Sequence, residues 1–238
     1  MSGGRLAGRV ALVTGASRGL GAAVARRFAA EGAELILLAR TSGGLEEVDD
    51  AVRSAGAHAT LVPLDITDFA ALDRLGAAIY ERHKRLDVLV ANAAMLGTLS
   101  PLAHIAPKEW QRVLDVNLTA NWRLICSLDP LLRASPAGRA IFVTASSGKA
   151  PRAYWGAYAV TKAALEQLAG IYAEEVAITP VKVNLVDPGR LRTAMRRQAY
   201  PGENPEIQPL PETVTDIFVE LAEAACRRHG ERIEAQPQ

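Results

Sequence analysis

The 238-residue sequence has few of the features that mark membrane, secreted or nucleic-acid-binding proteins. No apolar run approaches the roughly 20 residues that cross a bilayer, and the longest covers only residues 35–39. Residues 1–8 are not followed by the apolar block and small-residue cleavage site of a secretion signal. Basic and acidic side chains almost balance, at 27 and 26, so no strong field would attract nucleic acid or an anionic membrane. We therefore expect a soluble, cytoplasmic protein that binds neither.

Cysteine and histidine are also scarce. Cys126 and Cys226 lie far apart without CxxC spacing, so we expect reduced thiols that are buried or half-buried. The 4 histidines follow no metal-ligand spacing, so a metal site has little support.

Short apolar runs alternate with longer stretches of helical periodicity along most of the chain. This alternation is typical of βαβ units that feed a parallel sheet covered on both faces. We expect strands over residues 10–14, 35–38, 60–64, 88–90, 140–144 and 181–186. Helices are predicted over residues 21–30, 45–55, 69–83, 107–132, 158–177 and 212–226. The predicted class is α/β: one single-domain, doubly wound Rossmann fold over residues 1–238, with a parallel sheet of six to seven strands and helices on both faces.

The C-terminal part is less regular. Residues 188–211 concentrate proline and glycine, and we expect a structureless loop over the site, with residues 190–211 as the substrate loop. Residues 231–235 leave open whether a brief seventh strand forms. Earlier in the chain, Asp68 is a plausible N-cap, and Pro107 fits the first turn of a helix.

A glycine-rich turn follows the first predicted strand. Residues 14–21 read TGASRGLG and precede a helix. Glycines permit a tight turn and let a pyrophosphate approach the backbone at the helix N-terminus, where free N–H groups attract anions. The alternative is a strand-to-helix turn that merely needs positive φ at one glycine.

The second predicted strand ends in Arg40, where a fold of this kind places the adenosine ribose. A carboxylate there would bind the 2′-hydroxyl of NAD and repel a 2′-phosphate, whereas a guanidinium pairs with that phosphate. Arg18, inside the glycine turn, could approach the same phosphate. The two arginines favour NADP (NADPH) over NAD, although either taken singly could be a solvated surface charge.

Tyr158 and Lys162 are four residues apart and share one face of a predicted helix. A tyrosine is a useful acid or base near neutral pH only if its pKa falls by two to three units from about 10. We expect the ammonium of Lys162 and a positively charged nicotinamide to supply that shift. A surface pair without function is the alternative.

Together these motifs resemble the short-chain dehydrogenase/reductase family over nearly the whole chain. The turn is similar to that family's TGxxxGxG cofactor motif, and Tyr158 with Lys162 match its YxxxK motif. The resemblance implies that both residues bind the cofactor, together with turn residues Gly15, Ser17, Arg18, Gly19, Leu20 and Gly21.

Two further segments match cofactor-binding motifs of the family. Asp65 and Ile66 are similar to the family's adenine-contacting segment, in which Asp65 would accept from the adenine amino group. Asn92 and Ala93 stand in its NNAG motif, where alanines replace the first asparagine and the glycine. The resemblance implies that Asn92 stabilises the central sheet beside the cofactor.

At the reacting end, Asn117 matches an asparagine that holds a water in a proton relay to the lysine, but it could simply bond a backbone carbonyl. Ser146 and Ser147 precede Tyr158 by twelve and eleven residues, whereas members of the family commonly show twelve to fourteen. We therefore prefer Ser146 as the serine that orients the substrate carbonyl. After the sixth strand, the resemblance places Pro188 and Gly189 beneath the nicotinamide and Thr193 at its carboxamide.

The resemblance implies an oxidoreductase that transfers a hydride between NADP(H) and a small-molecule carbonyl or alcohol, with Tyr158 as general acid/base and with Lys162 lowering its pKa. A non-catalytic dinucleotide-binding regulatory protein of the same fold is the alternative. It would more naturally have lost Tyr158 or Lys162.

The substrate is not specified by the sequence. Leu96, Tyr154 and Trp155 indicate an apolar or aromatic wall, and Arg192 and Arg196 hint at an anionic group.

Leu118 and Trp122 share a helix face that, in the family, packs against a second subunit. The resemblance therefore implies a homodimer or homotetramer.

Overall fold

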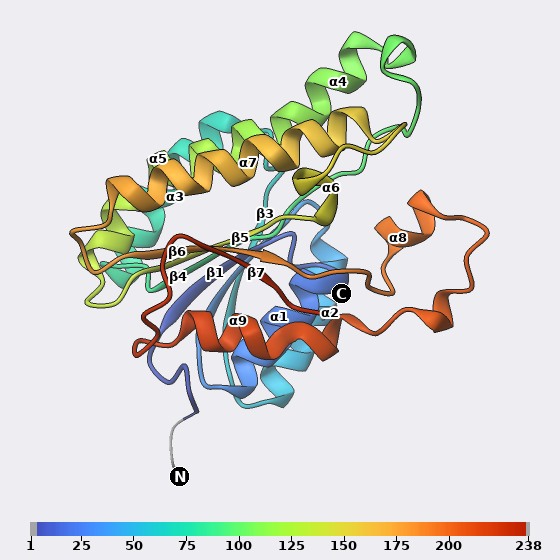
Figure 1. The fold of residues 1–238 in the computed structure, drawn as a ribbon. Coiled ribbons are helices and arrows are strands. Elements are labelled where there is room, and N and C mark those ends of the chain that lie inside the picture. Colours follow the sequence, from blue (N-terminus) through green and yellow to red (C-terminus); the bar gives the residue numbers. More distant parts are fainter. Residues whose placement is uncertain (1–3, 237–238) are drawn as a thin grey trace.

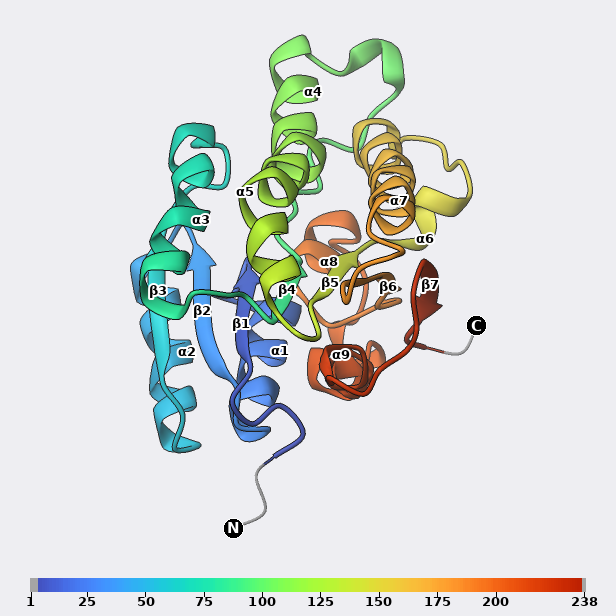
Figure 2. The same ribbon diagram turned by 90° about the vertical axis from the view of Figure 1, so that its left-hand side faces the viewer.

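The computed structural model describes residues 4–236 and contains one sheet of seven parallel strands. The strand order is β3-β2-β1-β4-β5-β6-β7, with β3 and β7 at opposite edges (Figure 2). The strands are β1 (Val10–Thr14), β2 (Glu34–Ala39), β3 (Ala59–Pro63), β4 (Val88–Ala91), β5 (Arg139–Val143), β6 (Lys182–Asp187) and β7 (Glu231–Glu234). The chain order reverses between β1 and β4, and ligands of doubly wound sheets bind at such a switch point, beyond the carboxyl ends of the strands. The predicted fold is confirmed.

Helices cover both faces of the sheet (Figure 1). One layer holds α1 (Gly19–Ala30), α2 (Ser42–Ser54) and α9 (Thr215–Ala222). The other holds α3 (Phe69–His83), α4 (Pro107–Leu114), α5 (Ala120–Ala134) and α7 (Gly156–Glu175). Strand β2 shows why its apolar run is continuous: Leu35 and Leu37 enter the core on one face, and Ile36 and Leu38 enter the core on the other.

Local signals placed several helix ends correctly. The Asp68 side chain accepts from the backbone N–H of Ala71 at 3.0 Å, and α3 has the predicted bounds. Pro107 is the first residue of α4, as predicted. The single helix expected over residues 107–132 is instead interrupted by a π-helical turn, η2 (Asp115–Thr119), between α4 and α5.

Residues 188–211 are not structureless, so that prediction is wrong. They contain α8 (Ala194–Ala199), which lies beyond the carboxyl ends of the strands (Figure 1), and the 3₁₀ turn η3 (Pro205–Ile207). The Thr193 hydroxyl accepts from the N–H of Arg196 at 3.2 Å and caps α8. Arg196 in turn forms a two-pronged ion pair with Glu203, at 2.6 Å for each contact, which closes the segment on itself.

In the C-terminal part, the last helix is shorter than the sequence pattern predicted, and a seventh strand follows it. The helix predicted over residues 212–226 is α9, preceded by the 3₁₀ turn η4 (Pro211–Val214). The open question of a seventh strand is resolved by β7, which pairs with β6 in parallel over Asn184–Asp187. A brief seventh strand therefore completes the sheet.

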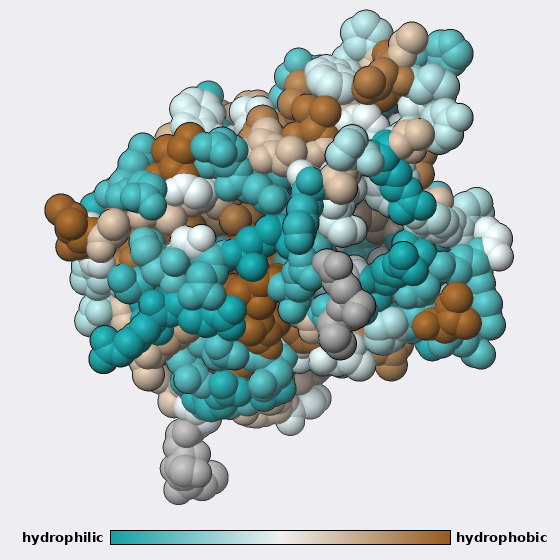
Figure 3. Space-filling model, viewed as in Figure 1, coloured by the Kyte–Doolittle hydropathy of each residue, from teal (hydrophilic) through white to brown (hydrophobic). Residues whose placement is uncertain are grey.

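Cys126 is exposed and Cys226 is half-buried, so the expectation of burial is wrong for Cys126. Cys126 lies on the outer side of α5, where the core does not reach. Within residues 4–236 no cluster of metal-ligating side chains occurs, and no helix is long and apolar enough to cross a membrane. The surface over α9 is mostly hydrophilic, whereas hydrophobic atoms show in small groups over the opposite helix layer (Figure 3).

Candidate active site

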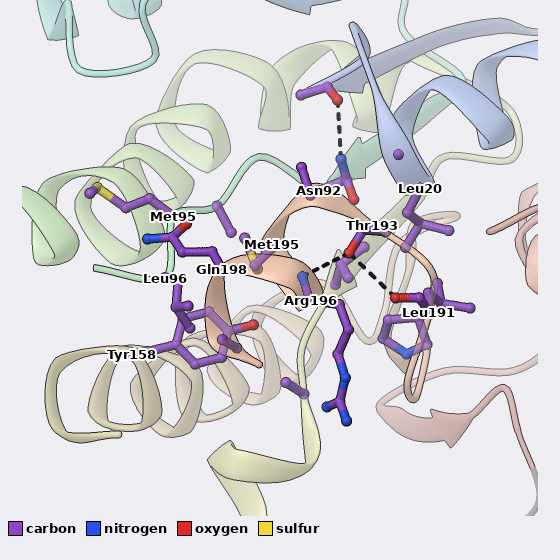
Figure 4. Close-up of a pocket in the computed structure, with 18 of the residues that line it drawn as sticks. Leu20, Asn92, Met95, Leu96, Tyr158, Leu191, Thr193, Met195, Arg196 and Gln198 are labelled. Carbon is purple, nitrogen blue, oxygen red and sulfur yellow. Dashed lines mark hydrogen bonds between the residues drawn. The ribbon is translucent and has the colours of Figure 1, made fainter. Parts of the chain in front are cut away.

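A cleft of about 1860 Å³ opens at the carboxyl ends of the strands. Its walls come from the segments after β1 to β6 and from α8, the arrangement expected at the switch point of a doubly wound sheet. Figure 4 shows Tyr158 and Leu96 on one side of this cleft, with Met195 and Gln198 of α8 facing them. Every residue predicted for the site lines the cleft except Gly21 and Asn117.

The glycine turn forms an open cradle at the start of α1. Gly15 has φ +65°, and a Cβ there would lie 2.9 Å from Nδ2 of Asn92. A Cβ on Gly21 would lie 2.3 Å from the carbonyl oxygen of Gly15, so Gly21 permits the close approach without lining the cleft itself. Arg18 is the N-cap residue, but its side chain does not cap the helix. The first N–H groups of α1 therefore remain available to an anion.

Arg40 and Asp65 lie together at the ends of β2 and β3. Their nearest charged atoms are 4.0 Å apart, and both side chains are about half exposed, so the pair is weak. One oxygen of Asp65 accepts from the backbone N–H and the hydroxyl of Thr67, at 2.9 and 2.8 Å. Burial opposes ionisation of Asp65, but these hydrogen bonds and Arg40 outweigh it and lower its pKa. Arg18 and Ile66 line the same end of the cleft.

Asn92 ties β4 to β1 beneath the cradle. Its Nδ2 donates to the carbonyl oxygen of Thr14 at 2.9 Å. The backbone N–H groups of Asn92 and Ala93 both donate to the Thr14 hydroxyl at 3.0 Å. These contacts hold the ends of the two central strands in register. Thr14 is thus a second member of this link that the motif comparison did not single out.

Tyr158 and Lys162 lie on α7 and face the cleft, with the Lys162 ammonium 5.7 Å from the centre of the Tyr158 ring. Lys162 Nζ donates to the carbonyl oxygen of Val143, the last residue of β5, at 2.7 Å. Among the described residues, no hydrogen bond engages the Tyr158 hydroxyl. The phenol is therefore open to a ligand while the lysine is fixed.

Burial controls the protonation of this pair. It lowers the pKa of Lys162 to about 8, although Asp187 and Glu166 partly oppose the shift. Burial, assisted by the negative charge of Asp187, raises the pKa of Tyr158 above its ordinary value. The expectation of a lowered Tyr158 pKa is thus not met by the protein alone, because burial and the negative charge of Asp187 both raise this pKa.

The two candidate serines differ in environment. Both lie in the short helix α6 (Ser146–Lys149) and line the cleft. Ser146 is exposed to the cleft, whereas the Ser147 hydroxyl is buried without a hydrogen-bond partner among residues 4–236. Ser146 is therefore the better placed of the two to meet a substrate oxygen.

Asn117 lies in the π-helical turn η2 and is buried below the cleft. Its Oδ1 accepts from the N–H of Met95 at 2.9 Å, and its Nδ2 donates to the carbonyl oxygen of Met95 at 2.9 Å and to the hydroxyl of Thr161 at 3.0 Å. The side chain thus binds a backbone carbonyl, which the sequence left as an alternative. It fastens the segment after β4 to α7, which carries Tyr158.

The segment after β6 forms the floor of the cleft opposite α7. Pro188 and Gly189 line it, and Gly189 has φ +71°. The Asp187 carboxylate accepts from the N–H of Gly189 at 3.0 Å and fixes this turn. Thr193 approaches the glycine turn, since a Cβ on Gly19 would lie 3.5 Å from its methyl carbon.

Aromatic side chains line the end of the cleft near Tyr158. The Trp155 ring lies edge-on to the Tyr158 ring, with 5.9 Å between the ring centres. The centre of the Trp155 ring is 6.0 Å from that of Tyr200. The arginines expected to meet an anion are otherwise engaged: Arg196 pairs with Glu203, and Arg192 donates to the backbone carbonyls of Gln208 and Glu206.

The site also contains residues that motif spacing did not reveal. Asp187 and Arg232 are brought beside α7 by the pairing of β6 with β7. The single signal in the sequence was an acidic residue directly before Pro188, in a strand that is otherwise apolar.

Comparison with known proteins places the chain in a family. The model of the family described as short chain dehydrogenase matches residues 9–204. The chain is 35% identical over 233 residues to the uncharacterized oxidoreductase YciK of Escherichia coli (strain K12), covering 96% of this chain and 92% of that protein. It is 33% identical over 251 residues to an uncharacterized NAD-dependent oxidoreductase of Mycobacterium tuberculosis (strain CDC 1551 / Oshkosh), covering 92% and 91%.

Among solved structures, a short-chain dehydrogenase from Escherichia coli CFT073 in complex with NADPH matches with a TM-score of 0.95 and 34% identity, covering 100% of both chains. The protein therefore belongs to the short-chain dehydrogenase family, and it is an oxidoreductase of that family.

Proposed function

We propose that this protein interconverts a small carbonyl compound and its alcohol with NADP(H) as the cofactor. The observation that carries the proposal is the placement of Tyr158, Lys162 and Ser146 on one cleft with the open glycine cradle. When bound, the nicotinamide supplies or takes up the hydride.

The cleft fits a dinucleotide. Gly15 and Gly21 let the turn pack against Asn92 where a Cβ would collide, and the uncapped N–H groups at the start of α1 would bind the pyrophosphate. Nine basic residues against five acidic ones line the cleft, in a chain whose formal net charge is only +1. NADPH carries two negative charges on its pyrophosphate and further negative charge on its 2′-phosphate, so the excess positive charge of the cleft complements this cofactor.

Arg40 supports NADP over NAD. It stands at the end of β2, next to Thr41 at the start of α2, and both line the cleft. A 2′-phosphate there would meet a guanidinium and an uncapped helix N-terminus, both of which favour an anion. The NADPH complex of the Escherichia coli CFT073 relative supports this choice, whereas the Mycobacterium tuberculosis relative is named NAD-dependent.

In the reduction direction, Tyr158 donates its proton to the substrate oxygen as charge develops there, and Ser146 hydrogen-bonds the same oxygen. Since the Tyr158 pKa is raised, the phenol holds this proton at neutral pH. Lys162, held by Val143, stabilises the phenolate left behind and binds the nicotinamide ribose. We retain the proposal that Asn117 takes part in proton resupply through a water relay; its side chain also holds Met95 and α7 in place.

The cofactor contacts are assigned residue by residue. Gly15, Ser17, Gly19 and Leu20 would hold the pyrophosphate, with Gly21 shaping the turn. Asp65 and Ile66 would contact the adenine, and Asn92 and Ala93 the neighbouring ribose. Pro188, Gly189 and Thr193 would face the nicotinamide.

We also propose that residues 1–238 act as one domain, that residues 190–211 form its substrate loop, and that it works in the cytoplasm as a homodimer or homotetramer. Leu118, Trp122, Leu168 and Ile171 line a shallow apolar depression between α5 and α7, which suits contact with a second copy.

The test is to mix purified protein with NADPH or NADH and a panel of aldehydes, ketones and diketones, and to follow nicotinamide absorbance. We expect oxidation of NADPH by at least one carbonyl compound, with weaker binding of NADH. Tight NADPH binding without turnover of any compound would instead favour a regulatory dinucleotide-binding protein, and no nucleotide binding would refute both functions.

A further inference from the structure

A network of charges lies beside Lys162 at the edge of the sheet formed by β7. The guanidinium of Arg232 contacts three carboxylates: Glu166 at 3.0 Å, Asp187 at 2.8 Å and Glu234 at 2.9 Å. The Arg232, Asp187 and Glu166 side chains are all at most one-fifth exposed. These pairs are therefore screened less by water and salt than the ion pairs on the surface.

The network joins the segments that carry the proposed catalytic groups. Asp187 ends β6 directly before Pro188, and Glu166 lies one helical turn after Lys162 on α7. The Thr144 hydroxyl, just after β5, donates to Glu166 at 2.6 Å. Arg232 on β7 thus links, through Glu166 and Asp187, the segments that carry Ser146, Lys162 and Pro188.

The two least exposed carboxylates of the network, Asp187 and Glu166, share the one guanidinium of Arg232. Glu234 also contacts Lys149, which is 3.4 Å away and largely exposed. The ammonium of Lys162 is 2% exposed and hydrogen-bonded to the neutral carbonyl of Val143, with no carboxylate in direct contact. Val143 pairs with Val186 across β5 and β6, and Asp187 follows Val186, so the carboxylate and the ammonium lie at the same end of neighbouring strands.

We propose that Asp187 and Arg232 act as opposing positioning residues that set the charge of Lys162, Asp187 holding the ammonium protonated and Arg232 limiting that effect. This inference rests on the proposed role of Lys162. Asp187 and Glu166 both raise the pKa of Lys162 against burial, and Asp187 also raises that of Tyr158.

Other elements around Lys162 add little charge. Glu166 on α7 and Asp187 on β6 act on Lys162 directly. Arg232 and Glu234 on β7 and Lys149 on α6 are connected to it only through the ion pairs of the network. On the side of η2, the described contacts come from the neutral Asn117 through Thr161. The network on β6, β7 and α7 is thus the main source of charge that a substitution can alter.

The test is to titrate Lys162 by NMR in protein carrying ¹³C at the lysine Cε. The chain has only five lysines, and a Lys162→Arg variant assigns the signal. We expect Asp187→Asn to lower the Lys162 midpoint by about half a pH unit to one unit, and Arg232→Gln to raise it by a similar amount. The double variant should lie between them. A merely structural role would not move the midpoint in opposite directions.

Arg228→Gln is the matched control, because Arg228 lies in the same C-terminal segment but pairs with Glu220 and Glu231 at the surface. It should leave the midpoint unchanged. If Asp187→Asn behaves like this control, or shifts the midpoint upward, the proposal is wrong. Asp187→Asn keeps the size and shape of the side chain and removes only its charge. This variant therefore tests the proposal even if the Arg232→Gln protein does not fold.

The titration needs neither cofactor nor turnover. A negative result would therefore contradict this proposal without contradicting the proposed function. In an active enzyme, the alkaline limb of kcat/KM for reduction should move with the lysine midpoint in each variant. A kcat loss without such movement would indicate a role in folding or packing instead.

Discussion

At the scale of single residues, burial decides the electrostatics of this cleft. Lys162 and Tyr158 are both removed from water, and burial favours the neutral form of each side chain. It therefore lowers the pKa of the lysine to about 8 and raises that of the tyrosine. Residue spacing in the sequence predicted the pair and its shared helix face. It could not predict the direction of the tyrosine shift, because burial depends on β5, β6 and α6 closing around the helix.

The buried Lys162 should reduce stability at neutral pH. Between about pH 8 and the ordinary pKa of 10.5, the folded state has released the proton that the unfolded chain still holds, so the free energy of unfolding rises with pH across this window. Replacing Lys162 by Met should stabilise the fold by about 1–2 kcal/mol near pH 7, a gain that disappears above the window. Urea denaturation of both proteins at several pH values measures this difference.

The raised pKa values of Tyr158 and Tyr172 lower stability at still higher pH, but they are present in both proteins and cancel in the comparison. A Lys162→Met protein that is less stable than the wild type at every pH would contradict the burial argument.

Arg40 should determine the preference for NADPH. Arg40→Asp removes a charge-assisted contact and places a carboxylate near the 2′-phosphate, which we expect to weaken NADPH binding by about 10- to 100-fold with little change for NADH. Fluorescence titration with both nucleotides measures the effect. Arg53→Asp makes the same charge change on the exposed far end of α2 and should leave both affinities nearly unchanged.

At the scale of elements, the π-helical turn η2 and Asn117 hold the segment after β4. The sequence predicted one continuous helix here, because apolar spacing hardly distinguishes a single wide turn from regular helix. It also missed α8, whose formation depends on the Thr193 cap and the Arg196–Glu203 pair rather than on an apolar stripe. By contrast, α3 was predicted in full because its start is fixed locally by Asp68.

Asn117→Leu should be strongly destabilising. It leaves the N–H and carbonyl of Met95 without their partner in a partly buried place, at a cost of about 2–4 kcal/mol in the free energy of unfolding. Urea unfolding should show this loss, whereas Gln111→Leu, which removes an exposed hydrogen bond to Asp115 from the same helical stretch, should change stability by less than about 0.5 kcal/mol. Equal stability of the two variants would argue against the role of Asn117.

At the scale of the whole molecule, the doubly wound parallel sheet with helices on both faces could be anticipated from the alternation of strands and helices and from the family resemblance. The sequence also indicated that one face of the α5 region meets a second copy. The structure leaves Trp122 and Ile171 about half exposed on adjacent helices at that face. An apolar group of this kind on two neighbouring helices is typical of subunit contacts.

Ile171→Glu should therefore dissociate the proposed oligomer into folded monomers, since it buries a charge in the apolar contact. Sedimentation velocity gives the oligomeric state, and circular dichroism checks the fold. Ile178→Glu is the matched control, because Ile178 is almost completely exposed beyond the end of α7. If Ile171→Glu sediments as the wild type does, the contact lies elsewhere.

The measurement that tests the account most directly compares Tyr158→Phe with the wild type for NADPH binding and for carbonyl reduction. Removal of the hydroxyl takes away the proton donor but not the walls of the cleft. We predict NADPH affinity within about twofold of the wild type and a fall in turnover of about 100- to 10,000-fold. Turnover at the wild-type rate by the Tyr158→Phe protein would contradict the central claim.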